Sequence, residues 1–280
     1  MIAHAAGWLA GAEGIALRWY RWDVAAARGG VLLLHGFGDH AGRYHDVARV
    51  LNGRGYSVLA YDERGHGASE GPRGHADSFE LYLFDLDAAW AEAKRSLLGP
   101  HFLYGHSFGG LTAMRWLQTR PQRPAGTILS APWLATAMRV PRLKLLAARV
   151  LLKVAPALAI PSGANVPENL TRDPQRVAAY LEDPLVHHLI SARFHAEAMK
   201  AQAEAKARPL PSGLPVLLIV PGDDPLVDAG PTLEWAREKG AGVQVRVREG
   251  GRHELHNDLD RDDVLAGVAD WLDACGGSNP

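Results

Sequence analysis

The sequence predicts an α/β fold in which a mostly parallel central sheet has helices on both faces and a helical cap insertion. Short apolar runs bounded by turn residues alternate with longer helical stretches from residue 31 onward, a pattern typical of such sheets. The stretch between Pro132 and Gly213 breaks this alternation, because its helical segments are separated by prolines and it contains no convincing strand. We therefore expect one domain interrupted by an insertion.

Most of the expected strands are apolar, as strands buried on both faces of a sheet are. They cover residues 31–35, 56–61, 102–105, 127–130, 216–220 and 243–247. Residues 15–22 are expected to add an antiparallel strand at one edge. The expected helices cover residues 44–53, 78–98, 109–119 and 264–274. The resulting organisation is a core made of residues 1–132 and 213–280, with residues 133–212 as the cap insertion.

Composition excludes several classes of function. Of the 280 residues, 47% are hydrophobic and 22% are charged, as in an ordinary globular domain, and the formal net charge of -1 provides no basic field for nucleic acid. Cys275 is the only cysteine, so no intramolecular disulfide can form. No run of about 20 apolar residues predicts a membrane span, and the N-terminus lacks the features of a signal peptide. We expect a cytoplasmic protein.

The segment GHSFG at residues 105–109 lies between an expected strand and an expected helix. In this context a G-x-S-x-G turn forces the serine into a strained, exposed conformation, and the small flanking residues let neighbouring backbones approach. A phosphate-binding loop is the alternative, but the segment has neither the Gly-x-Gly-x-x-Gly spacing nor the lysine of a P-loop. Ser107 is therefore the expected nucleophile.

A second glycine-rich segment, HGFG at residues 35–38, follows the first expected parallel strand. Its glycines allow the loop to turn beneath the nucleophile, so that the backbone N–H of Phe37 joins that of Phe108 in an oxyanion hole. Such a hole needs backbone donors alone, so the bulk of Phe37 is tolerated. We interpret His35 as a structural histidine.

The acid and the base should follow the serine in that order. Asp-Pro-Leu-Val occurs twice, at Asp183 and at Asp224, but only Asp224 follows an expected strand and so reaches the carboxyl edge of the sheet. His253 and His256 both follow the last strand, and His253 lies closer to its end. A zinc site at these two histidines is an alternative, although the His-Glu-x-x-His motif is absent. We expect no metal or organic cofactor.

One helical segment of the insertion, residues 141–154, carries two different stripes. The basic stripe consists of Arg142, Arg149 and Lys153, and the apolar stripe includes Leu143, Val150 and Val154. Two interpretations remain open: a helix packed on the core with a solvated stripe, or a helix that lies on a membrane surface. The second would give the protein a peripheral membrane contact through its cap.

Together these segments resemble the monoacylglycerol lipase and lysophospholipase branch of the α/β-hydrolases, a serine aminopeptidase S33-type family. The resemblance extends from about residue 7 to residue 272. It is carried by HGFGDHAGRY from His35, YDERGHGASEGPRGH from Tyr61, GHSFGG from Gly105, TRDP from Thr171, DPLVHH from Asp183, GDDPLVD from Gly222 and GRHELHND from Gly251.

The resemblance implies the α/β-hydrolase fold, with the family's nucleophile, acid and histidine at Ser107, Asp224 and His253 and its oxyanion N–H groups at Phe37 and Phe108. The chain departs from the family at two points. Phe108 follows the nucleophile where many members have methionine, and a single residue separates Gly222 from Asp224 where many members have a longer step.

The expected activity is hydrolysis of a carboxylic ester with a single acyl chain, a small-molecule or lipid substrate of the monoacylglycerol or lysophospholipid kind, through an acyl-enzyme. Two alternatives stay open. One is an acyltransferase that uses the same three residues with an alcohol acceptor, and the other is a hydrolase-fold binding protein without turnover. The sequence predicts no oligomeric state.

Overall fold

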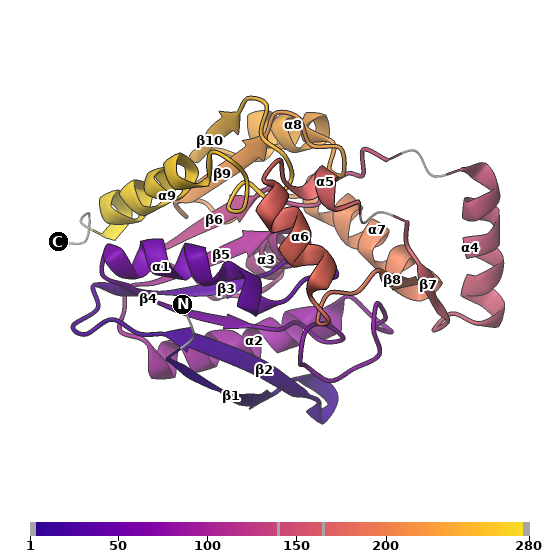
Figure 1. Cartoon of the computed structure of the whole chain (residues 1–280), viewed down its shortest axis with the longest axis horizontal. Coiled ribbons are helices and arrows are strands. Elements are labelled where there is room, and N and C mark those ends of the chain that lie inside the picture. Colours follow the sequence, from indigo (N-terminus) through magenta and orange to yellow (C-terminus); the bar gives the residue numbers. More distant parts are fainter. Residues whose placement is uncertain (1–3, 139–140, 164–165, 277–280) are drawn as a thin grey trace.

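The computed structural model describes residues 4–138, 141–163 and 166–276. Within these residues one sheet contains the strands β1 (Ala5–Ala10), β2 (Ala16–Trp22), β3 (Gly29–Leu34), β4 (Tyr56–Tyr61), β5 (His101–His106), β6 (Gly126–Ser130), β9 (Val216–Pro221) and β10 (Val243–Arg248). Their order is β1-β2-β4-β3-β5-β6-β9-β10 (Figure 1). The strands from β4 to β10 in this order run parallel, and β1 and β2 are antiparallel. The predicted mostly parallel sheet is confirmed.

The edge of the sheet differs from the prediction. β2 is antiparallel as expected, but β1 lies outside it and forms the edge, pairing from Ala5 with Arg21 to Ala10 with Ala16. Most side chains of β1 are alanine or glycine, and every second residue is exposed. A strand of small residues without β-branched side chains has little of the composition by which strands are recognised. The sequence pattern therefore missed it.

Helices cover both faces of the sheet, as predicted. One face carries α1 (His45–Gly53) and α9 (Arg261–Gly276), and the other carries α2 (Glu80–Ser96), α3 (Phe108–Thr119), α7 (Ala192–Ala207) and α8 (Ala229–Lys239) (Figure 1). Strand β3 shows how this arises, because successive side chains of a strand point to opposite faces. Val31 and Leu33 pack with α1 and α9, whereas Leu32 and Leu34 pack with α2 and α3.

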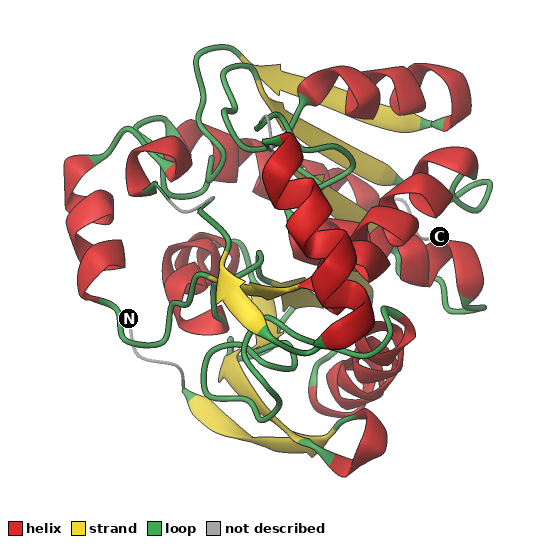
Figure 2. Ribbon diagram, turned by 90° about the vertical axis from the view of Figure 1, so that its right-hand side faces the viewer, coloured by secondary structure: helices red, strands yellow, loops and turns green. Residues whose placement is uncertain are grey.

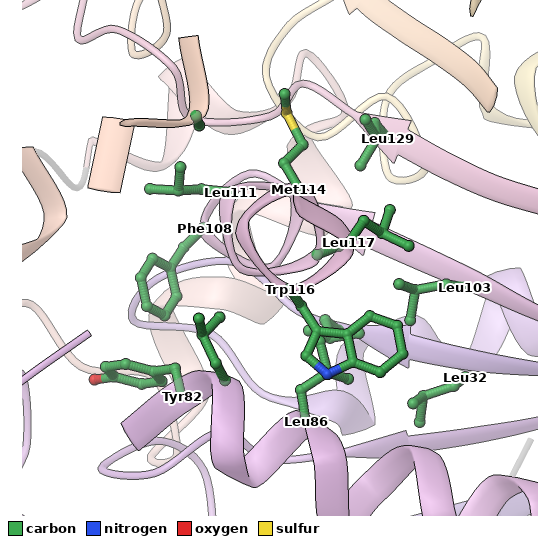
Figure 3. Close-up of a cluster of buried hydrophobic side chains, with 14 of the residues drawn as sticks. Leu32, Tyr82, Leu86, Leu103, Phe108, Leu111, Met114, Trp116, Leu117 and Leu129 are labelled. Atoms are coloured by element: carbon green, nitrogen blue, oxygen red, sulfur yellow. The ribbon is translucent and has the colours of Figure 1, made fainter. Parts of the chain in front are cut away.

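A large part of the buried core surrounds α3, the helix that begins directly after Ser107. Figure 3 shows the side chains of α3 between the sheet and α2, with Phe108 directed toward Tyr82. The two rings meet edge to face with their centroids 4.9 Å apart, a favoured geometry for aromatic pairs. Phe108, Leu111 and Met114 are all fully buried. This packing holds the start of α3, and with it the turn at Ser107, in place.

The insertion contains α4 (Arg142–Val154), α5 (Pro167–Leu170), α6 (Pro174–Glu182) and two short strands, β7 (Ala159–Pro161) and β8 (Leu189–Ser191). The expectation of a strandless insertion is wrong, because β7 and β8 pair antiparallel. Three residues are too few to show the alternation by which a strand is recognised. The predicted bounds of the insertion, residues 133–212, stay a prediction.

Helix α4 lies at the periphery of the molecule (Figure 1). In Figure 2, where the right-hand side of Figure 1 faces the viewer, α4 lies in front. None of its residues is buried, and it contacts α7. The interpretation of this segment as a helix packed on the core is therefore wrong. Among the described helices, none combines the length and apolar character needed to cross a bilayer.

Candidate active site

Ser107 occupies the turn between β5 and α3, with φ 51° and ψ -112°. A non-glycine residue at positive φ is strained and is found where the surrounding structure holds it in place. Two glycines make the tight turn possible. A Cβ at Gly105 would lie 2.6 Å from the carbonyl oxygen of Gly109, and a Cβ at Gly109 would lie 2.5 Å from that of His35. The backbone thus presents the Ser107 hydroxyl at the end of the strand, as predicted.

His253 and Asp224 lie next to this serine. The Nε2 atom of His253 is 2.8 Å from Ser107 Oγ, and its Nδ1 atom is 2.7 Å from Asp224 Oδ2. The carboxylate can only accept, so Nδ1–H donates to Asp224, which leaves Nε2 to accept the hydroxyl proton of Ser107. Ser107 and His253 are buried. The structure therefore brings together the three residues that the sequence predicts.

The charges around His253 favour its protonated form. Burial alone would lower the pKa of His253, but the Asp224 carboxylate, its hydrogen bond, and the charges of Glu254 and Asp39 raise that pKa above its ordinary value. Burial would raise the pKa of Asp224, but His253 and the N–H groups of Val227 and Leu226 lower it. Asp224 is thus held ionised beside an imidazole whose affinity for a proton is increased.

The two Asp-Pro-Leu-Val copies share one local structure. Asp224 Oδ1 accepts the N–H of Leu226 at 2.8 Å, and Asp183 Oδ1 accepts that of Leu185 at 2.9 Å. In each case the second oxygen binds a histidine, His253 for Asp224 and, at 2.8 Å, His40 for Asp183. The motif is therefore a turn that presents a carboxylate to an imidazole, and position in the fold decides which histidine it meets.

His256, the alternative base, has a different environment. Its ring stacks on Tyr44 with the centroids 4.5 Å apart, and it lies edge-on to His106. Burial lowers the pKa of His256 to about 4. In the described part of the chain, no group of three or more His, Cys, Asp or Glu side chains is arranged to hold a metal ion. The zinc alternative at His253 and His256 therefore has no geometric support.

The loop after β3 passes directly beneath Ser107. A Cβ at Gly36 would lie 3.2 Å from His106 Cδ2, and the N–H of Gly109 donates to the carbonyl oxygen of His35 at 3.1 Å. Both ring nitrogens of His35 are engaged, by the carbonyl oxygen of Gly36 and the N–H of Glu63, so its interpretation as a structural histidine is confirmed. Phe37 lines the cavity at Ser107. The oxyanion assignment of Phe37 and Phe108 stays a prediction.

A cavity of about 120 Å³ opens at Ser107. Most of its wall is apolar and includes Trp133, Met138, Leu170, Ile190, Leu226 and Val227. Its polar side is formed by Asp39, Arg43 and Glu254, beside His253. None of these three was singled out from the sequence. Glu254 directly follows His253, while Asp39 and Arg43 lie in the segment HGFGDHAGRY, so the available signal was their position beside the predicted site residues.

The chain is similar to several known proteins. The family model described as serine aminopeptidase, S33 matches residues 25–260. Phospholipase YtpA of Bacillus subtilis is 33% identical over 247 residues, which cover 87% of this chain and 94% of that protein. Human monoglyceride lipase is 34% identical over 235 residues, which cover 82% of this chain and 76% of that protein.

Two further matches are a much longer relative and a solved structure. The chain spans 26% of an uncharacterised abhydrolase domain-containing protein of Dictyostelium discoideum, with 31% identity over 246 residues. The crystal structure of Paleococcus ferrophilus monoacylglycerol lipase superimposes with a TM-score of 0.83 at 32% identity, covering 92% of this chain and 99% of that one. The chain therefore belongs to the serine aminopeptidase, S33 family, and it is a serine hydrolase with the α/β-hydrolase fold.

Proposed function

We propose that this protein hydrolyses a carboxylic ester with a single acyl chain, of the monoacylglycerol class, with Ser107 as the nucleophile. One observation carries the proposal. An unbroken series of short hydrogen bonds runs from Asp224 through His253 to Ser107 Oγ, at a strained turn that opens into a mostly apolar cavity. This is the arrangement in which a serine hydroxyl is activated by an adjacent base that is oriented by a third group.

In the proposed reaction, His253 Nε2 takes the hydroxyl proton as Ser107 Oγ attacks the ester carbonyl carbon. Asp224 fixes the tautomer of His253 and stabilises the charged imidazolium. The oxyanion is bound by the N–H groups of Phe37 and Phe108, and the second belongs to the first turn of α3, where N–H groups have no partner within the helix. Loss of one such donor typically costs about 10²- to 10³-fold in rate.

Collapse of the tetrahedral intermediate breaks the bond to the alcohol oxygen, and imidazolium His253 donates its proton to that oxygen. The acyl group then remains on Ser107 Oγ. Water attacks the acyl-enzyme with His253 again as base, and the carboxylic acid leaves while Ser107 regains its proton. The same steps with an alcohol in place of water would give the acyltransferase alternative.

One observation favours a neutral alcohol part over an anionic headgroup. The names of the relatives do not decide, because the human relative and the Paleococcus ferrophilus structure are named monoglyceride or monoacylglycerol lipase and the Bacillus subtilis relative is named phospholipase. The polar side of the cavity holds two carboxylates, Asp39 and Glu254, against one cation, Arg43. Burial would raise the pKa of both acids, but Arg43 lowers both, that of Asp39 to about 2. The net negative charge there disfavours a phosphate headgroup.

A chain-length profile tests this function. With monoacylglycerols from acetyl to dodecanoyl, kcat/KM should rise at least as far as octanoyl, by up to about fourfold per methylene, because each buried CH₂ contributes about 0.8 kcal/mol. Lysophosphatidylglycerol of the same chain length should be a poorer substrate. A preference for acetyl esters, or transfer to an added alcohol in place of hydrolysis, would contradict the proposal. Labelling of the protein by a fluorophosphonate shows independently whether the serine is reactive.

We further propose that α4 rests on the membrane surface from which the substrate is taken. Leu143 and Val154 are 78% and 72% exposed, and Leu146 and Val150 are exposed as well. The predicted basic stripe of Arg142, Arg149 and Lys153 lies on the same exposed helix. Exposed apolar residues beside cations are the composition of helices that lie in the interface of anionic bilayers.

Vesicle sedimentation tests this contact. Changing Arg142, Arg149 and Lys153 to Gln should weaken binding to phosphatidylserine vesicles, because each cation near such a surface contributes about 1 kcal/mol. Added salt should also weaken the binding of the wild type to these vesicles. A matched control changes Lys94, Arg123 and Arg237, three exposed basic residues on other parts of the surface, to Gln. Equal loss of binding in both triple variants would show that net charge, and not α4, is responsible.

A further inference from the structure

A buried ion cluster lies beside the three proposed catalytic residues. Arg43 Nη1 is 2.8 Å from Glu254 Oε1, and Arg43 Nη2 is 2.7 Å from Glu254 Oε2, so the pair is bidentate. Arg43 Nη1 also lies 2.9 Å from Asp39 Oδ1. The side chains of Arg43, Asp39 and Glu254 are 11%, 6% and 4% exposed. A cluster shielded in this way is much less screened by solvent than an ion pair at the surface.

The cluster connects two loops that must act together. Arg43 belongs to η2 (Ala41–Tyr44), which follows the loop that carries Phe37, and Glu254 directly follows His253. A bidentate contact between a guanidinium and a carboxylate fixes relative orientation as well as distance. Asn257 Nδ2 donates to Glu254 Oε2 at 2.7 Å and so holds the carboxylate from its own loop.

The insertion covers this cluster. The ring of Tyr180, on α6, lies over the guanidinium of Arg43 at 4.8 Å from the ring centroid. The N–H of Glu254 donates to the carbonyl oxygen of Leu170 at 2.8 Å. Removal of the cluster from water makes its geometry stiffer, because a charge that lost its partner there would be strongly destabilised.

We propose that Arg43 and Glu254 are positioning residues, whose ion pair sets the loop that carries the Phe37 N–H relative to the loop that holds His253 against Ser107. The inference rests on the proposed function, since it takes Ser107 and His253 as the reacting groups. The oxyanion donor and the base come from different loops, so their spacing depends on whatever joins these loops. An error of about 1 Å in such a spacing can lower the rate about 10²-fold.

The effect of Glu254 on the pKa of His253 distinguishes a positioning role from a contribution to stability alone. The charged groups that act on His253 are Asp224 from the loop after β9, Glu254 from its own loop and Asp39 from the loop after β3. His256 from its own loop, and His106 with Ser107 from the end of β5, face it as well. Arg43 binds both Asp39 and Glu254. Burial lowers the pKa of His253, while Asp224, Glu254 and Asp39 raise it. Loss of the Glu254 charge should therefore lower that pKa, a change that loss of stability alone does not produce.

The test is the pH dependence of ester hydrolysis by Glu254→Gln. The acid limb of kcat/KM reports protonation of His253, and activity rises as pH increases through its pKa. In Glu254→Gln this limb should move to lower pH, and kcat at the plateau should fall about 10- to 100-fold with KM little changed. Glu254→Asp keeps the charge but cannot span the same distance, so it should lower kcat while leaving the acid limb in place.

Asp258→Asn is the matched control. Asp258 is a buried carboxylate of the same loop that pairs with Arg172, so its loss should lower the melting temperature without moving the acid limb. If Glu254→Gln does not fold, Asp39→Asn removes a charge from the other side of the same cluster and should shift the limb in the same direction.

Three results would overturn the inference: a wild-type kcat in Glu254→Gln, a lower kcat with an unmoved limb in that variant, or a rise in KM alone, which would make the pair a substrate contact. Failure of the wild type itself to react with fluorophosphonate would instead contradict the proposed function.

Discussion

Replacement of Ser107 by alanine should abolish ester hydrolysis and covalent labelling by a fluorophosphonate, with a loss in kcat of about 10⁶-fold. The hydroxyl is the proposed site of acyl transfer. We propose no structural role for its hydrogen bond to His253 Nε2. The melting temperature should change little. Alanine adopts the positive φ of this turn at the same backbone strain as serine, and its Cβ occupies the same space.

The measurements are steady-state kinetics, intact mass after treatment with the probe, and thermal unfolding of both proteins. The wild type should gain the mass of one phosphonyl adduct, and the variant should gain none. A persisting adduct in Ser107→Ala, for example on Ser162, which lines the same cavity, would contradict the assignment of the nucleophile.

The two Asp-Pro-Leu-Val copies provide the second large effect. Asp224→Asn should lower kcat about 10⁴-fold, because an amide can donate to His253 Nδ1 and so favour the tautomer in which Nε2 cannot accept the proton of Ser107. Asp183→Asn makes the same chemical change in the same local turn, and its partner is His40. It should therefore change kcat little, which makes it a matched control for Asp224→Asn.

Steady-state kinetics of the two variants at one pH, together with their melting temperatures, make this comparison. Asp183→Asn is expected to weaken the contact between the insertion and the loop after β3, which should appear as a lower melting temperature. Losses of kcat of equal size in both variants, or a larger loss in Asp183→Asn, would show that the acid has been assigned to the wrong copy.

The central sheet and the three proposed catalytic residues were predictable because each depends on a short, local pattern. A buried parallel strand is a run of apolar residues, and the turn at Ser107 requires glycines two positions before and after it. Asp224 and His253 lie in the loops that follow β9 and β10, so the topology of a parallel sheet places them at the same edge. The choice between Asp183 and Asp224 used only this position, and the structure places Asp224 beside His253.

The features that the sequence did not predict depend on distant contacts. β1 forms from alanine and glycine because β2 offers it an unpaired edge, and the pair β7 and β8 joins segments about 30 residues apart. Arg43 and Glu254 are 211 positions apart in the chain, so no local pattern could show that they meet. For α4 the sequence left two interpretations open, core packing or a membrane surface, because an amphipathic pattern alone does not say what its apolar side faces.

The separation of α4 from the core also bears on how proteins of this kind diverge. None of its residues is buried, and substitutions at such positions usually change stability by no more than about 0.5 kcal/mol. Mutations can therefore accumulate in this helix without unfolding the protein, whereas the contacts of the insertion with the site, of Tyr180 with Arg43 and of Leu170 with Glu254, must change together with their partners. Substitutions within residues 141–154 can therefore change which membrane surface the protein binds, while the reacting groups keep their geometry.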